Sequence, residues 1–420
     1  MNIFNRKKSE TAHKSMRIRN HTAIFFRNAL LRLHYIILCT LIGLLSACGG
    51  SGSAPSHSLS PAAAVGEKLF NDINLSASGA QACATCHNPN NAHAQANDLA
   101  VQLGGQNLDQ RGFRAPPSLN YDNLIPLASF DATGNPVGGF DRDGRAATLA
   151  AQAQGPLLTS FEMGNSSGAE VVGKVKQAAY AAEFSSAFGA GIFDNPVQAF
   201  DRIAYALQQY QLESAAFHPY NSKYDQFLNG EVTLTSAEAN GLALFNDPAR
   251  GNCASCHTSA KAVDASLPAF TNFKFVNLGI PRNSGIPANA DSSYFDLGLC
   301  GPDRLDLANR TNLCGAFKVP TLRNVATRNV FFHNGSFNDL TAAVTFLVQR
   351  DTNPASWYPQ DSNGQVQKFN DLPAAYQANV DTQDAPFNRN PGMAPALSAS
   401  EISDLVQFLG TLTDNYTAQP

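Results

Sequence analysis

Two short stretches of this 420-residue chain carry the same reactive side chains at the same spacing. The repeated residues are Cys83, Cys86 and His87 in the first stretch, and Cys253, Cys256 and His257 in the second. Cys-x-x-Cys-His is the attachment signature of a c-type haem, in which two thiols bond to the porphyrin and the adjacent His binds the iron. The sequence therefore predicts two covalently bound haems, with His87 and His257 as proximal iron ligands.

Two other kinds of site also use closely spaced cysteines. A zinc site needs two more Cys or His ligands at short spacing, and neither stretch has a second Cys-x-x-Cys. A thioredoxin-like redox pair needs a βαβ context, whereas the flanking residues here have helical patterns. Both stretches also follow a Leu-Phe-Asn-Asp segment, which begins three residues after Gly66 or Gly241. Because the flanks repeat as well as the motif, we favour the haem interpretation.

The beginning of the chain predicts export and anchoring. Residues 6–32 are rich in Lys and Arg, residues 35–45 are almost wholly apolar, and Leu-Ser-Ala leads into Cys48. We interpret residues 1–47 as a signal peptide of the lipoprotein type, Cys48 as its lipidation site and residues 48–60 as a flexible tether. An ordinary cleaved signal or an uncleaved anchor is the alternative, although the apolar run is shorter than the roughly 20 residues that span a bilayer.

Charge and the remaining cysteines bear on partners and compartment. Eight of the 29 Lys and Arg and one of the 33 Asp and Glu precede residue 48, which leaves a net charge of −11. This charge argues against nucleic acid and anionic membrane surfaces as partners. Cys300 and Cys314 enclose 13 residues, and in an oxidising compartment we expect them to form a disulfide worth on the order of 3 kcal/mol. Two free thiols are the alternative.

The elements around these residues are expected to be mainly α-helical. We predict two cytochrome c-like domains, residues 61–213 and 236–416, joined by a linker over 214–235 and carrying long ordered loops. Apolar spacing and caps predict helices over 61–71 with Ser60 as N-cap, 146–154 ending at Gly155-Pro156, 168–188 in two pieces, 196–212, 340–349 and 400–412, and one that Ser236 caps. Helix 196–212 is expected to bury Val197, Phe200, Ile203, Ala204 and Leu207.

Beyond the haem motifs, the chain resembles the bacterial di-haem cytochrome c peroxidases and their MauG-type relatives over nearly all of its length after the tether. The stretches that carry the resemblance are Asp143-Gly144-Arg145, Gly155-Pro156 leading to Glu162-Met163, Phe-Lys-Val-Pro-Thr-Leu-Arg-Asn-Val at 317–325, Phe-Phe-His-Asn-Gly at 331–335, Arg-Asp-Thr-Asn-Pro at 350–354 and Trp-Tyr-Pro at 357–359. Together they are far more specific than the haem motifs alone.

The resemblance implies roles for several residues. It makes the N-terminal haem the one that reacts with peroxide, with Glu162 and Gln152 on its distal side. A carboxylate there can move a proton between the two peroxide oxygens, and an amide can position them. The C-terminal haem would accept electrons from a small periplasmic donor, such as a mono-haem cytochrome c or a cupredoxin.

The chain departs from the family pattern at three positions. Arg142 stands where the family commonly has a Trp between the haems, and Leu347 stands where the second haem has a distal Met or Tyr. Ala115 replaces an Asn that helps to hold an inter-domain calcium, which makes calcium doubtful. Met393, in a loop before the last helix, is a candidate replacement ligand, and Tyr358 and His333 are others. An open sixth position is the alternative. His93 and His218 are expected to be structural or exposed, although His93 is close enough to the first motif to be a distal switch ligand.

Three classes of function remain open. The first is a peroxidase that reduces hydrogen peroxide, the second a MauG-like oxidase that modifies a partner protein, and the third a pure electron carrier. Glu162 and Gln152 favour the first two. We expect a periplasmic protein held at the outer membrane only through its lipid anchor, because Gly49 rather than Asp follows Cys48.

Overall fold

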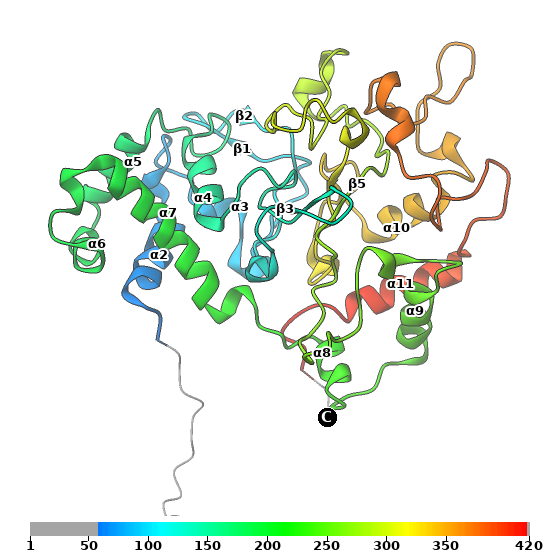
Figure 1. Ribbon diagram of the computed structural model, residues 1–420, viewed down its shortest axis with the longest axis horizontal. Helices are drawn as coiled ribbons and strands as arrows, with labels where there is room; N and C mark the ends of the chain where they lie inside the picture. The colour runs from blue at the N-terminus through cyan, green and yellow to red at the C-terminus, as the bar shows by residue number, and fades with distance from the viewer. Residues whose placement is uncertain (1–57, 418–420) are drawn as a thin grey trace, which may run out of the picture. The chain divides into compact units, whose positions relative to one another are not determined.

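A computed structural model describes residues 58–417, which are mainly helices joined by long loops (Figure 1). The helices are α2 (Pro61–Asn71), α3 (Cys83–Cys86), α4 (Leu149–Leu158), α5 (Gly168–Gln177), α6 (Ala181–Phe188), α7 (Pro196–Glu213), α8 (Lys223–Leu228), α9 (Ser236–Asn246), α10 (Leu340–Gln349) and α11 (Ala399–Gly410). The strands are the two-residue segments β1 (Leu103–Gly104), β2 (Gln110–Arg111), β3 (Ser129–Phe130), β4 (Pro136–Val137), β5 (Phe275–Val276) and β6 (Phe317–Lys318). The helix-rich architecture confirms the prediction of a mainly α fold.

The first helix pair consists of α2 and α7, which pack against each other (Figure 1). Ser60 caps α2 by accepting a hydrogen bond from the amide of Ala63, and Pro61 fits the first helical position because no donor is needed there. Gly66 lies where the helices cross, and a Cβ at this position would clash with the carbonyl oxygen of Ala206. Glycine therefore allows the two helix backbones to come into direct contact.

The second helix pair repeats this arrangement. Helix α9 packs against α11, and a Cβ at Gly241 would clash with the carbonyl oxygen of Asp404. The aromatic residues that follow the two glycines, Phe70 and Phe245, are both fully buried. The repeat in the sequence is thus a repeat in the structure. In both copies, the Gly and the Phe lie at the contact between two helices, just before a Cys-x-x-Cys-His stretch.

Helix α4 differs from the prediction at both ends. It begins at Leu149, because the side chain of Thr148 caps it, and it continues through Gly155 and Pro156 to Leu158. Proline removes one helical hydrogen bond and its ring crowds the carbonyl four residues earlier, so it usually ends or kinks a helix; here the helix continues for two residues beyond Pro156. Leu157 is 1 % exposed, so burial of the final turn against the core favours this extension.

Smaller differences follow from caps and packing. Thr235, and not Ser236, caps α9, since it forms a reciprocal capping box with Glu238. Val197 is 75 % exposed although it was expected in the buried face of α7, whose buried residues include Ile203, Ala204 and Leu207. Ser398 caps α11, which therefore starts at Ala399, one residue before the prediction. Helix α10 has the predicted bounds, and 168–188 is two helices, α5 and α6.

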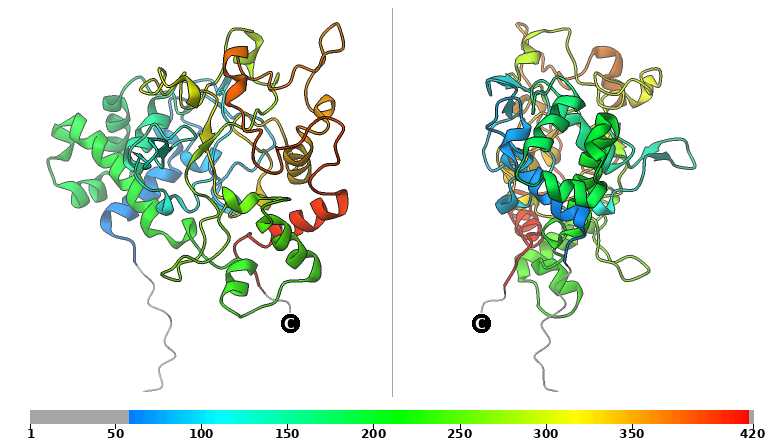
Figure 2. Two further views of the ribbon diagram at one scale, coloured as in Figure 1. Left: turned by 45° about the vertical axis from the view of Figure 1, so that its right-hand side comes forward. Right: turned by 90° about the vertical axis from the view of Figure 1, so that its left-hand side faces the viewer.

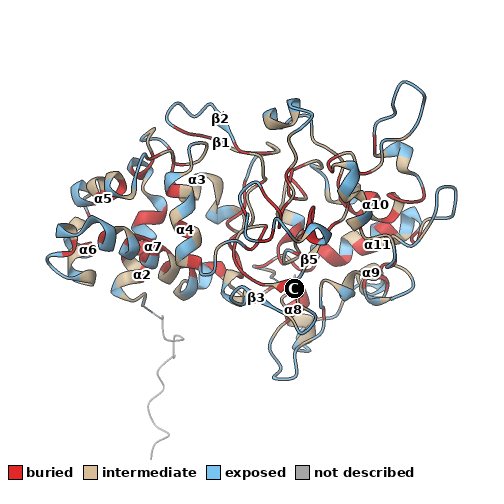
Figure 3. Cartoon of the chain, turned by 45° about the horizontal axis from the view of Figure 1, so that its top comes forward, coloured by how far each residue is buried: buried red, intermediate tan, exposed pale blue. Residues whose placement is uncertain are grey.

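The apolar core is divided between the helix-rich parts of the chain. One cluster lies within 59–217 around α2, α4, α5 and α7, and others lie within 224–412 around α9, α10 and α11. Two further views show the loops between these parts (Figure 2). Buried residues line the inner faces of α7 and α11, while the outlying loops are exposed (Figure 3). Contacts join the chain from Leu59 onward into one compact unit.

The segment between the helix pairs is structured. Residues 214–235, expected as a linker, include α8, whose Asp225 is buried and bonded by Arg323 with an N–O distance of 2.8 Å. Residues 1–57, with the predicted signal, Cys48 and most of the tether, lie outside the part that the structure describes. Among residues 58–417 the longest helices are too short or too polar to cross a bilayer.

Candidate functional site

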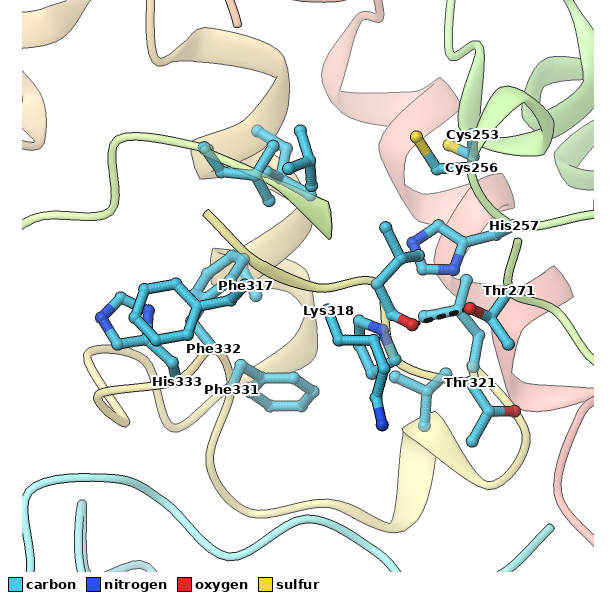
Figure 4. Close-up of a pocket in the computed structure, with 18 of the residues that line it drawn as sticks. Cys253, Cys256, His257, Thr271, Phe317, Lys318, Thr321, Phe331, Phe332 and His333 are labelled. Carbon is cyan, nitrogen blue, oxygen red and sulfur yellow. Dashed lines mark hydrogen bonds between the residues drawn. The ribbon is translucent and has the colours of Figure 1, made fainter. Parts of the chain in front are cut away.

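The second Cys-x-x-Cys-His stretch opens into a cavity of about 340 Å³. Cys253, Cys256 and His257 all line it, and Figure 4 shows them together on one side. Nδ1 of His257 donates to the carbonyl oxygen of Phe270 at 2.8 Å. This bond leaves Nε2 to serve as a metal ligand, the arrangement that metal-binding histidines commonly have.

The cavity suits a large flat apolar group with a few charges. Most of its walls are apolar, and they include Phe245, Val319, Leu347 and Leu405. Its volume lies in the range of cofactor pockets. Neither Cys253 nor Cys256 is in a disulfide, so both sulfur atoms are free for the two thioether bonds of a c-type haem. The residues present therefore fit the group that the motif predicts.

The first stretch has the same local chemistry. Cys83 and Cys86 are unpaired on α3, and Nδ1 of His87 lies 3.3 Å from the carbonyl oxygen of His93. Burial raises the pKa of the Cys83 thiol to about 12 and lowers the pKa of His87 to about 4. Burial has the same effect in the second stretch, where the pKa of His257 falls to about 4. Neutral imidazoles keep the lone pair that binds iron.

Local contacts hold Glu162 near the first stretch. Gln81 donates from Nε2 to Sγ of Cys86 at 3.4 Å and to the carbonyl oxygen of Leu103 at 3.4 Å. The amide of Gly105 then donates to the carbonyl oxygen of Glu162 at 2.7 Å. Burial is the main cause that raises the pKa of Cys83 and Cys86, and the charge of Glu162 adds a smaller rise to both, so its carboxylate lies within electrostatic reach of both thiols.

Glu162 and Gln152 belong to one acidic cluster. Burial, and then the negative charge of Asp141, raise the pKa of Glu162 to about 7, while Arg145 partly offsets the shift. Gln152 donates from Nε2 to Oδ1 of Asp141 at 3.2 Å, and Arg145 lies 3.5 Å from the other oxygen of Asp141. Asp141 thus connects the two residues expected on the distal side. Gln152 also lines the cavity of His257.

The candidates for a distal ligand at the second site lie in different places. Leu347 lines the cavity, whereas Met393 is 49 % exposed and its sulfur accepts from the amide of Asn390. The structure therefore does not bring Met393 to His257. Tyr358 is buried and donates to the carbonyl oxygen of Gly279 at 2.6 Å. His333 lines the cavity but stacks on Phe317 with a centroid distance of 3.8 Å (Figure 4).

The remaining predicted residues make bonds or packing contacts within the fold. Cys300 and Cys314 are joined by a disulfide within a buried apolar cluster. Nδ1 of His93 donates to Oδ1 of Asn120 at 2.7 Å and the ring stacks on Phe217, while Nε2 of His218 donates to the carbonyl oxygen of Leu212 at 3.0 Å.

Sequence reasoning did not identify Asp141, Arg328 or Lys318 as site residues. Asp141 lies two residues before the Asp-Gly-Arg stretch, and this closeness to another acidic residue was the signal that could have identified it as a site residue. The cavity brings in Arg142, Lys318 and Arg328 from segments far apart in the sequence. No local pattern marks such a grouping, because it depends on how the loops pack.

Comparisons with known proteins agree with this geometry. The family described as "Di-haem cytochrome c peroxidase" matches residues 60–233. The methylamine utilization protein MauG of Paracoccus denitrificans is 38% identical over 295 residues, which cover 68% of this chain and 73% of that protein. The cytochrome c551 peroxidase of Pseudomonas aeruginosa is 28% identical over 286 residues, which cover 67% of this chain and 70% of that protein.

A solved structure is similar over more of the chain. The crystal structure of the diheme peroxidase BthA from Burkholderia thailandensis matches with a TM-score of 0.78 and 37% sequence identity, and the match covers 86% of this chain and 87% of that one.

Proposed function

Because the chain belongs to the family of di-haem cytochrome c peroxidases and MauG proteins, and so is an oxidoreductase, we propose that it reduces hydrogen peroxide to water with electrons from a small redox protein. We further propose that its two c-type haems are covalently attached, one in each of two cytochrome c-like domains over 61–213 and 236–416. The attachment residues would be Cys83 and Cys86 with His87 as ligand, and Cys253 and Cys256 with His257 as ligand.

The observation that carries the proposal is the state of Glu162. It is a half-buried carboxyl with a pKa of about 7, within electrostatic reach of Cys83 and Cys86. A general acid–base group is most effective when its pKa lies near the working pH. A simple electron carrier has no need of such a group, so Glu162 favours an enzyme that transfers protons.

The proposed chemistry divides between the haems and the side chains. Each haem, when bound, supplies an iron that exchanges single electrons and, in the first site, a place for peroxide. Glu162 accepts a proton from one peroxide oxygen and returns it to the other, which leaves as water. Gln152 orients the oxygens through its amide, and its bond to Asp141 fixes that amide. Two electrons and two protons then convert each peroxide into two water molecules.

Glu162→Gln tests this role, because it keeps the shape of the side chain and removes the base. We expect the haem content and visible spectra to survive while steady-state peroxide consumption with a reduced cytochrome c donor falls by about 10²–10⁴-fold. Glu183→Gln is the matched control, since Glu183 is exposed and forms a surface ion pair with Lys68. Turnover by Glu162→Gln close to that of the control would show that the base lies elsewhere.

A MauG-like reaction is the second candidate. The relative from Paracoccus denitrificans is 38% identical, which exceeds the 28% of the peroxidase from Pseudomonas aeruginosa. In this alternative the same distal residues would serve the oxidation of a partner protein. Peroxide turnover that stays low with several donors, together with peroxide-dependent modification of a co-expressed protein, would favour it.

We also propose a periplasmic location, with lipid on Cys48 as the only membrane attachment and the outer membrane as its site. The partners are then hydrogen peroxide and a small periplasmic donor, such as a mono-haem cytochrome c or a cupredoxin. Cys48→Ala is expected to release a soluble or unprocessed form in cell fractionation. A wild-type protein found wholly in the soluble periplasmic fraction would contradict the anchor.

A further inference from the structure

Two guanidinium groups line the cavity of His257 beside one short stretch of backbone. Arg142 donates from Nε to the carbonyl oxygen of Ala115 at 2.7 Å and from Nη2 to that of Pro116 at 3.4 Å. Arg328 donates from Nη2 to the same carbonyl of Pro116 at 3.0 Å and from Nε to that of Val330 at 3.3 Å. Two positive charges from distant segments thus converge on Pro116.

Neither guanidinium has a counter-ion within the part of the chain that the structure describes. No carboxylate oxygen there lies within 4.0 Å of Arg142 or Arg328, and Nη1 of each makes no hydrogen bond. Arg323, another cavity residue, shows the contrast because it is paired with Asp225 at 2.8 Å. Burial, and then the charges of Arg328 and Arg114, lower the pKa of Arg142 to about 9, although Asp296, which also lines the cavity, offsets part of this shift from beyond 4.0 Å.

Such an arrangement is costly in the absence of an anion. Removing a charge from water is unfavourable unless a partner compensates it, and like charges placed together add repulsion. Backbone carbonyls satisfy donors but carry no net charge. The remaining N–H groups of the two side chains are free to bind something in the cavity, and a guanidinium fork matches a carboxylate closely.

We infer that Arg142 and Arg328 form a carboxylate-binding site in this cavity, and that its ligand is the propionates of the haem attached at Cys253 and Cys256. This inference rests on the proposed attachment of that haem. Propionates are the anionic groups of a haem, and in a mainly apolar cavity they need cationic partners. Arg142 then has a role that a tryptophan at this position does not have, since it neutralises charge between the two haem sites.

The test measures the reduction potential of the haem, which depends on the charges around it, rather than turnover. Removing a cation beside a propionate leaves its negative charge uncompensated, which stabilises ferric iron and lowers the reduction potential. We therefore expect Arg142→Gln and Arg328→Gln each to lower the midpoint potential of the second haem in spectroelectrochemical titration of the holoprotein. Arg142→Lys and Arg328→Lys keep the charge and should stay closer to the wild type. Arg202→Gln, on the exposed face of α7, makes the same charge change and should have no effect.

Several results would overturn the inference. These are Gln variants with the wild-type potential, Lys variants shifted as far as the Gln variants, or a shift confined to the first haem. Loss of holoprotein with Lys as well as Gln would also count against it, because Lys should keep the propionates paired. A wild-type potential that moves with added formate would assign the site to a free carboxylate instead. Haem stoichiometry is measured separately, and a value of one haem per chain would refute the proposed attachment.

Discussion

At the scale of single residues, Glu162 makes the proposed reaction depend on pH. Partial removal from water raises its pKa to about 7, and the negative charge of Asp141 adds to the rise. The base form is therefore lost as the pH falls through 7, and about one tenth of it remains one unit lower. We expect kcat/KM for peroxide to fall about fivefold from pH 7 to pH 6, and about tenfold more from pH 6 to pH 5, in steady-state assays.

The control for this pH profile is Glu162→Gln, whose residual activity should lack the step near pH 7. A similar step in the Gln variant would assign the titration to another group. Asp141 is the first alternative, since burial raises its pKa as well and it is bonded to Gln152.

Leu347 and Met393 give a second prediction at this scale. Leu347 lines the cavity of His257 but has no atom that binds iron, and Met393 lies exposed outside it. We expect the second haem to be high-spin in electron paramagnetic resonance and to be unchanged by Met393→Ala. Leu347→Met adds a thioether inside the cavity and should produce a low-spin signal. A low-spin second haem in the wild type that disappears in Met393→Ala would contradict this assignment.

At the scale of elements, the repeated glycines control how the helix pairs pack. A Cβ at Gly66 or Gly241 would clash with the backbone of the partner helix. Either Gly→Ala variant must push α2 from α7, or α9 from α11, and overpacking of this kind costs about 1–3 kcal/mol. We expect both variants to have a lower free energy of unfolding in denaturant titrations, with haem spectra retained where the fold survives.

The matched control for the helix pairs is Gly173→Ala in α5. Gly173 is also helical, but a Cβ there would meet no atom within 4 Å. Alanine at this position should be neutral or stabilise the protein by up to about 1 kcal/mol, because it is the better helix former. Equal effects at Gly66 and Gly173 would mean that helix propensity, and not the crossing, determines the cost.

The helices also show which parts of the fold can be predicted from the sequence. The first helix and α10 were predictable, since Ser60 with Pro61, and the apolar spacing of 340–349, are local signals. The C-terminal end of α4 was not predictable. Pro156 is a strong stop signal for a helix, but the burial of Leu157 outweighs it. The haem-attachment residues are likewise a local pattern, whereas the grouping of Arg142 with Arg328 depends on loop packing that no local pattern encodes.

At the scale of the whole molecule, an ion-pair network ties the two halves of the chain together. Arg114 contacts Asp296, which is 182 residues away, through Nε at 2.6 Å and Nη2 at 2.7 Å. It also contacts the fully buried Asp143 through Nη1 at 2.7 Å. Burial by itself would raise the pKa of Asp143, but Arg114 and Arg145 hold it below its usual range. The network therefore joins the Asp-Gly-Arg segment to the loop that carries Asp296.

Arg114→Met should weaken the link between these two segments, because it leaves the buried Asp296 without its cation and leaves Asp143 with Arg145 alone. Breaking a buried pair in this way costs about 3–5 kcal/mol, and denaturant unfolding at pH 7 measures it. A carboxyl with a depressed folded pKa contributes stability above its unfolded pKa and loses it as the pH falls through the folded value. The difference in unfolding free energy between wild type and Arg114→Met should therefore narrow below about pH 4.

Arg202→Met, at the exposed surface of α7, is the control and should change the unfolding free energy little. In a double-mutant cycle, Asp296→Asn should lower the unfolding free energy much less in the Arg114→Met background than in the wild type. Costs that simply add, or a gap that does not change with pH, would show that the two halves are held together by other contacts.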